Sequence, residues 1–205
     1  MPRIDSDPGG APRKRGERVR ARHASRAPRP LIVVLTGSES TGKTTLAERL
    51  AARYGVAWGA EFVREYAVAK GTPLDAADVE PIARGQIALE DRARADAARA
   101  GDGLVVLDTD LLSTAVYARH YYGACPPWIE RAVRERRADL YLLCVPDVPW
   151  VADPQRDRPR ARDEMHALFA AKLVEIGATS VEVRGEWKER ERIAVAAVDE
   201  LLDER

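Results

Sequence analysis

The residues best suited to chemistry form one glycine-bounded octapeptide that ends in a lysine and a threonine. It reads Gly37-Ser38-Glu39-Ser40-Thr41-Gly42-Lys43-Thr44, after an apolar run and before a helical pattern. This spacing is typical of a phosphate-binding loop, because the glycines let successive backbone N–H groups point into one concavity at a helix N-terminus. Lys43 would then reach the β- and γ-phosphates of ATP, and the Thr44 hydroxyl would ligate Mg²⁺. We expect nine residues to bind the nucleotide: Gly37, Ser38, Glu39, Ser40, Thr41, Gly42, Lys43, Thr44 and Thr45.

Acidic side chains are predicted at the same edge of the fold. Asp108 and Asp110 follow the apolar run 104–107. Ligands of parallel sheets lie beyond the carboxyl ends of the strands, so both carboxylates should border the phosphate loop. We expect Asp108 to hold Mg²⁺. In extended backbone Asp110 would face the same side and serve a substrate hydroxyl, and it could also cap the helix that begins at Leu111.

A third carboxylate, Glu61, closes another short apolar segment. There it could take the proton of an attacking hydroxyl or bind a ribose diol. Arg64 and Glu65 follow at helical spacing, so they could contact the substrate or pair with Glu61 on the surface.

An arginine-rich segment follows the apolar run 140–145. It has no periodicity and holds Arg156, Arg158, Arg160 and Arg162 within seven residues. Small kinases have a mobile lid at this point, whose arginines close over the phosphates and stabilise developing charge. Arg156 and Arg158 are the first candidates for catalysis, whereas Arg160 and Arg162 could serve the next helix.

Aromatic residues gather after Asp110. Tyr117 and Tyr121 are four positions apart and therefore share one helix face. They could pack in the core or stack on a flat heterocycle of the substrate.

The order of elements predicts an α/β fold with a parallel five-stranded sheet flanked by helices. Continuous apolar runs suit strands covered on both faces, and they alternate here with helical patterns. We expect strands at 31–36, 56–60, 104–107, 140–145 and 179–183, and helices ending near 54, 70, 100, 122, 137, 176 and 202.

Length and charge indicate one folded unit, residues 31–205, after a basic tail. The chain has 205 residues and no net charge. Residues 1–30 are rich in proline, glycine and arginine without an apolar face, so we expect them to be disordered. The basic tail could contact a nucleic acid or an anionic surface, but its composition favours a solvated tail. No apolar run is long enough for a membrane span, and two cysteines suit a reducing cytosol, so we expect a cytoplasmic protein.

Four motifs in this order carry a family resemblance. They are GSESTGKTTL (37–46), EFVREY (61–66), DTDLLST (108–114) and VPWVADPQR (148–156). Together they resemble the ribosylnicotinamide kinase domain of NadR-type proteins, a P-loop NTPase family with AAA-like ATP binding, over roughly residues 31–200. The resemblance implies a P-loop kinase fold and Mg²⁺-dependent transfer from ATP to the ribose 5′-hydroxyl of nicotinamide riboside, which gives nicotinamide mononucleotide for NAD salvage.

Two other functions fit the same motifs. A kinase of another nucleoside or small metabolite would share every part except the base pocket. A regulatory P-loop ATPase that acts on a partner would hydrolyse ATP slowly without an acceptor, whereas a kinase needs one. The sequence leaves the oligomeric state open.

Overall fold

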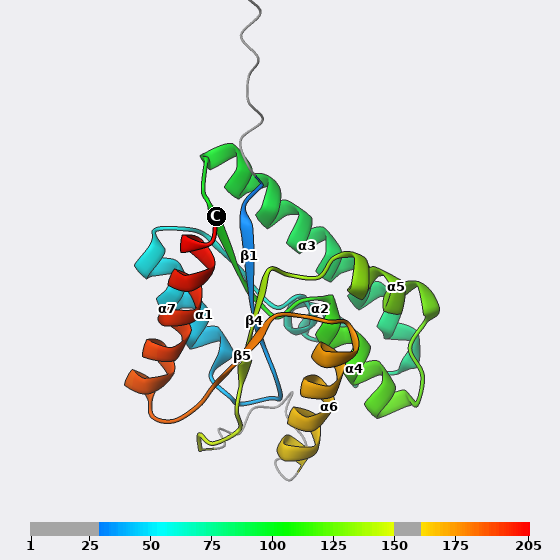
Figure 1. Ribbon diagram of the computed structural model, residues 1–205. Helices are drawn as coiled ribbons and strands as arrows, with labels where there is room; N and C mark the ends of the chain where they lie inside the picture. The colour runs from blue at the N-terminus through cyan, green and yellow to red at the C-terminus, as the bar shows by residue number, and fades with distance from the viewer. Residues whose placement is uncertain (1–28, 150–160) are drawn as a thin grey trace, which may run out of the picture.

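A parallel β-sheet forms the centre of the computed structural model, which describes residues 29–149 and 161–205 (Figure 1). Its strands are β1 (Leu31–Thr36), β2 (Trp58–Gly59), β3 (Leu104–Asp108), β4 (Leu140–Cys144) and β5 (Ser180–Val183). They lie in the order β2-β3-β1-β4-β5, and every pairing is parallel. The predicted five-stranded parallel sheet is therefore confirmed.

Helices cover both faces of the sheet because side chains alternate along each strand. Val33 and Leu35 face α1 (Lys43–Tyr54) and α7 (Trp187–Asp203). Ile32 and Val34 face the opposite layer, which contains α3 (Val79–Ala100), α4 (Leu111–Tyr122), α5 (Pro127–Glu135) and α6 (Arg162–Glu175). Figure 1 shows α1 and α7 on one side of the strands and α4 to α6 on the other.

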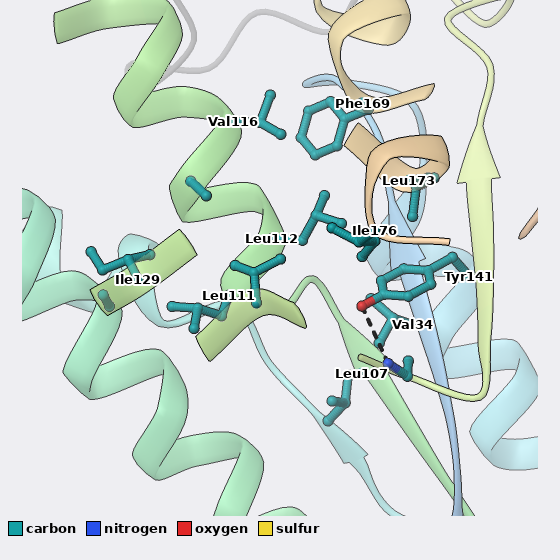
Figure 2. Close-up of a cluster of buried hydrophobic side chains, with 14 of the residues drawn as sticks. Val34, Leu107, Leu111, Leu112, Val116, Ile129, Tyr141, Phe169, Leu173 and Ile176 are labelled. Carbon is teal, nitrogen blue, oxygen red and sulfur yellow. Dashed lines mark hydrogen bonds between the residues drawn. The ribbon is translucent and has the colours of Figure 1, made fainter. Parts of the chain in front are cut away.

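The larger apolar cluster fixes α4 and α6 against the sheet. Figure 2 shows Phe169 and Leu173 of α6 near Leu112 of α4, with Tyr141 of β4 beneath them. Phe169 and Leu112 are completely buried, so truncating either to alanine should cost about 2–5 kcal/mol of stability. This packing matters for the site because α4 carries Tyr117 and Tyr121.

Most predicted helix ends are correct, and their cause is visible. Gly55, Gly101 and Gly123 adopt left-handed backbone angles directly after α1, α3 and α4, where a residue with a Cβ would be strained. Helix α2 (Phe62–Lys70) ends at Gly71 in the same way. A single 3₁₀ turn, η1 (Ala76–Asp78), precedes α3 and is capped by Asp75.

The predicted strand at 56–60 is too long. Only Trp58 and Gly59 pair, opposite Val106 and Leu107 of β3. This strand lies at the sheet edge and has one neighbour, so the chain can leave the ladder after two residues and enter α2.

Two predictions fall largely outside the described residues: the tail at 1–30 and the arginine-rich segment. Arg29, counted in the tail, donates to both carboxylate oxygens of Asp139, and its carbonyl accepts from Arg205. Asp139 in turn accepts from the Ile32 N–H at the start of β1. Arg29 therefore belongs to the folded part. No helix within 29–149 or 161–205 has the length and apolarity to cross a membrane.

Candidate functional site

The phosphate loop connects the carboxyl end of β1 to the N-terminus of α1. Gly37 and Gly42 have φ angles of 124° and 80°, which glycine tolerates best. A Cβ at Gly37 would lie 2.8 Å from the carbonyl oxygen of Cys144, so the close approach to β4 also requires glycine. The loop thus has the backbone geometry that its spacing predicts, at the positive end of a helix dipole.

The Lys43 side chain lies back across this loop. Its ammonium donates to the carbonyls of Gly37 at 3.1 Å and Ser38 at 2.9 Å. Thr41 also donates to the Ser38 carbonyl, at 2.9 Å, while the buried Ser38 hydroxyl has no partner among the described residues. Lys43 is therefore held over the concavity in which phosphate oxygens would bind.

Thr44 and Asp108 form the part of the site that suits a metal ion. The Thr44 hydroxyl donates to Asp108 Oδ2 at 2.5 Å. Asp108 Oδ1 is buried and has no partner within the described part of the chain. Burial raises the pKa of Asp108, while Lys43 and Thr44 oppose this shift. An unpaired, desolvated carboxylate oxygen beside a hydroxyl fits the oxygen ligands that Mg²⁺ prefers.

No group of three or more His, Cys, Asp or Glu residues gathers around a metal position in the part of the chain that the structure describes. In Mg²⁺ sites of phosphate-transferring proteins, one or two side chains act together with water and the phosphates of the nucleotide.

A cavity of about 800 Å³ opens beside the loop. Six of the residues singled out in the sequence line it: Glu39, Lys43, Glu61, Arg64, Tyr117 and Tyr121. Glu61 accepts a hydrogen bond from Arg64 Nε at 2.8 Å. The pairing considered for these two residues therefore forms, and it forms at the cavity wall.

Tyr117 packs against the core, and both Tyr117 and Tyr121 line the cavity. Their rings stack with centroids 5.9 Å apart and an interplanar angle of 10°. Tyr117 also meets Phe169 of the core edge to face at 5.7 Å. Core packing therefore holds a pair of aromatic rings at the wall of the cavity.

Asp110 does not share the side of Asp108, and that prediction is wrong. Thr109 between them has a φ of 79°, so the backbone is not extended there. Asp110 caps α4 by accepting from the Leu112 N–H at 3.1 Å, and it accepts from the buried Tyr141 hydroxyl at 2.8 Å. It does not line the cavity. Its contacts are those of a helix cap, the other role considered for this residue.

Two predicted residues of the site are exposed to solvent and do not line the cavity. Glu65 is exposed on α2, and Thr45 is exposed in the first turn of α1; neither lines the cavity. Arg156 and Arg158 lie outside the described residues. Arg162, at the start of α6, donates to the carbonyls of Val148 at 2.9 Å and Ser40 at 3.4 Å, so this arginine reaches the phosphate loop.

Three buried polar residues of the cavity wall were not expected from the sequence: Gln86, Thr109 and Ser113. Gln86 joins two sides of the cavity, accepting from the Phe62 N–H at 3.1 Å and donating to the Thr109 carbonyl at 3.4 Å. Thr109 and Ser113 carry buried hydroxyls without a partner in the described structure. The available signal for Gln86 was its position four residues after Ile82, on the apolar face of α3.

The sheet order, the phosphate loop after β1 and the carboxylate at the end of β3 define a P-loop kinase fold. A family model described as an AAA domain matches residues 32–190, and the chain belongs to that family.

Among curated proteins, the chain is 28% identical over 180 residues to the "Trifunctional NAD biosynthesis/regulator protein NadR" of Escherichia coli (strain K12). The match covers 84% of this chain and 43% of that protein, so the chain spans less than half the length of this relative.

Solved structures of NadR are similar to this chain as well. A crystal structure of NadR protein in complex with NR superposes with a TM-score of 0.71 at 28% identity, over 84% of this chain and 49% of that one. NadR in complex with NAD and AMP-PNP gives a TM-score of 0.66 at the same identity and coverage. A thymidylate kinase from Ehrlichia chaffeensis, 15% identical over 85% of this chain and all of its own, has a TM-score of 0.59 and shares the fold. The predicted resemblance to the NadR-type kinase domain is confirmed.

Proposed function

We propose that the protein transfers the γ-phosphoryl group of ATP to the ribose 5′-hydroxyl of nicotinamide riboside and so produces nicotinamide mononucleotide. One observation carries the proposal. A single cavity borders Lys43 of the phosphate loop, the Glu61 carboxylate and the stacked rings of Tyr117 and Tyr121. Its volume of about 800 Å³ is within the range of small-molecule sites. It suits an acceptor with a sugar hydroxyl at one end and a flat ring at the other.

The nucleotide end of the site follows from the loop. Its backbone N–H groups and Lys43 bind the phosphates of ATP, and Thr44 and Asp108 hold Mg²⁺. When bound, Mg²⁺ neutralises negative charge on the phosphates. Lys43 adds a positive charge beside the group in transfer, where developing charge is stabilised most effectively.

Glu61 is the proposed base. Its side chain is 14% exposed and is oriented by Arg64. As the 5′-oxygen bonds to the γ-phosphorus, the bond from that phosphorus to the β,γ-bridging oxygen breaks and ADP leaves. The hydroxyl proton passes to the Glu61 carboxylate. The catalytic role of Arg156 and Arg158, which lie outside the described residues, stays a prediction.

The relatives support the choice of acceptor and donor. One NadR structure contains NR and another contains AMP-PNP, an ATP analogue. The chain spans 43% of the Escherichia coli relative, so that protein's role in NAD biosynthesis is carried over only as part of this proposal. A nucleoside-type substrate and a cytoplasmic location belong to the same proposal.

A panel of acceptors tests the proposal. The protein is incubated with Mg-ATP and nicotinamide riboside, adenosine, cytidine, uridine or thymidine, and ADP and phosphorylated products are measured by liquid chromatography and mass spectrometry. Lys43→Ala is the control for contaminating kinases. We expect nicotinamide mononucleotide as the main product. If only another nucleoside is phosphorylated, nicotinamide riboside is not the acceptor. ADP formation without any acceptor would favour a regulatory ATPase.

A further inference from the structure

Arg190 of α7 is an unusual side chain in this fold because its guanidinium is buried. The residue is 1% exposed, although α7 is a highly charged helix. A buried charge is costly unless it is paired and its hydrogen bonds are satisfied. The contacts of Arg190 therefore indicate what it stabilises.

Those contacts join three segments to α7. Arg190 Nε donates to the Gly185 carbonyl at 2.8 Å, after β5. One terminal nitrogen donates to the Thr41 carbonyl at 3.1 Å, in the phosphate loop. The other donates to the Val145 carbonyl at 2.7 Å and to the Asp147 carboxylate, both after β4.

Asp147 completes this connection. Its second carboxylate oxygen accepts from the Gly185 N–H at 2.6 Å. Burial opposes ionisation, but the Gly185 amide and Arg190 lower the pKa of Asp147 overall. The Asp147 carboxylate is therefore ionised at neutral pH, and it ties the ends of β4 and β5 to the same guanidinium.

We propose that Arg190 is a positioning residue for the triphosphate. By holding the Thr41 carbonyl, it fixes the peptide plane between Thr41 and Gly42, which directs the Gly42 N–H into the concavity of the loop. Trp187, one turn earlier on α7, supports the same point, since a Cβ on Gly42 would lie 2.5 Å from its ring. The inference rests on the proposed function only in that the loop binds ATP.

Lysine is the informative substitution. Guanidinium donors form a planar fork that reaches three carbonyls and a carboxylate at once, whereas an ammonium is a point charge with three donors on a differently shaped stem. Arg190→Lys keeps the charge but leaves part of this set unsatisfied. The matched control is Arg192→Lys on the same helix, because Arg192 is exposed and pairs with Glu189.

The experiment measures the Kd of Mg-AMP-PNP by calorimetry, well below the melting temperature of each variant. Amide hydrogen exchange of residues 37–44 is measured in the same proteins without nucleotide. We expect Arg190→Lys to raise the Kd at least about tenfold, Asp147→Asn to raise it less, and Arg192→Lys to leave it within about twofold. Exchange should accelerate in the phosphate loop of Arg190→Lys and stay unchanged in α4.

A residue that contributes only to stability would lower the melting temperature without changing the Kd of the folded protein. An unchanged Kd, or faster exchange that is uniform over the chain, would therefore overturn the inference. If Arg190→Lys does not fold, Asp147→Asn decides by the same criteria. If the wild type itself does not bind AMP-PNP, the proposed function fails, and hydrogen exchange alone still tests the positioning of the loop.

Discussion

Asp110→Asn separates the two roles that the sequence allows for Asp110, a helix cap and a group that acts on the substrate. Asparagine caps helices about as well as aspartate, so the α4 N-terminus keeps an acceptor for the Leu112 N–H. We expect kcat/KM to stay within about threefold of the wild type, whereas loss of a general base typically costs a factor of about 10²–10⁴.

The same substitution should change how stability depends on pH. Burial, together with the Glu90 carboxylate, raises the pKa of Asp110 to about 7, and an aspartate in the unfolded chain titrates near pH 3.9. Between these values the folded protein binds more protons than the unfolded chain, so the free energy of unfolding falls as the pH rises. The stability that this group contributes is fully present below about pH 4 and is lost once the pH has risen through about 7.

The magnitude follows from the width of that window. Each pH unit is worth about 1.4 kcal/mol, so the wild type should lose about 3 kcal/mol from this group between pH 5 and pH 8. For a chain of this size, that corresponds to about 6–12 °C in melting temperature. Asp110→Asn removes the titrating group. Between pH 5 and pH 8 its melting temperature should therefore fall by about 6–12 °C less than that of the wild type.

The assay is thermal unfolding followed by circular dichroism at pH 5, 6, 7 and 8, with kcat/KM measured at pH 7.5. Asp139→Asn is the control. Burial opposes ionisation of Asp139, but Arg29 and the Ile32 N–H lower its pKa overall, so it should not titrate above pH 5. Parallel pH profiles for the wild type and Asp110→Asn would refute the account of this buried carboxylate. A hundredfold loss of kcat/KM would refute its assignment as a cap.

Four further predictions concern the nucleotide and metal site and the tail. Lys43→Ala should lower kcat/KM at least about a thousandfold with little change in melting temperature. An ADP-release assay measures the turnover, and substantial remaining activity would show that Lys43 is not required. Asp108→Asn should raise the Mg²⁺ concentration for half-maximal activity by about 10–100-fold, and an unchanged Mg²⁺ titration would remove Asp108 from the metal site. Gly37→Ala should destabilise the protein by about 1–3 kcal/mol, because the added Cβ would meet the Cys144 carbonyl and the φ at position 37 is positive. Urea unfolding measures this loss, and an unchanged free energy of unfolding would show that the loop can relax. Removal of residues 1–28, which leaves the Arg29–Asp139 contacts intact, should change kcat/KM by less than about twofold if the tail is solvated, and a large loss would assign it a role in the site.

Local patterns were enough to predict much of this fold. The apolar run Leu31–Thr36 and the glycine spacing after it predicted β1, the loop and α1, because strand burial, loop curvature and helix initiation each depend on nearby residues. Asp108 was placed at the end of β3 for the same reason, and the structure puts Thr44 beside it.

Two features depended on information that the local sequence does not carry. The direction of Asp110 is set by the left-handed backbone of Thr109, a conformation rare for a β-branched residue and therefore not expected from the sequence. The burial of Arg190 depends on carbonyls from three distant segments. Its one local signal was its position four residues before the buried Ala194, on the apolar face of α7.

We propose that the cavity beside the phosphate loop holds the acceptor of the phosphoryl group. The most direct test is to incubate the protein with nicotinamide riboside and ATP labelled with ¹⁸O at the γ-phosphate, and then to locate the label by tandem mass spectrometry. We expect nicotinamide mononucleotide that carries the labelled phosphoryl group on its 5′-oxygen, with one ADP formed for each product. Labelled inorganic phosphate and unchanged nicotinamide riboside would contradict it.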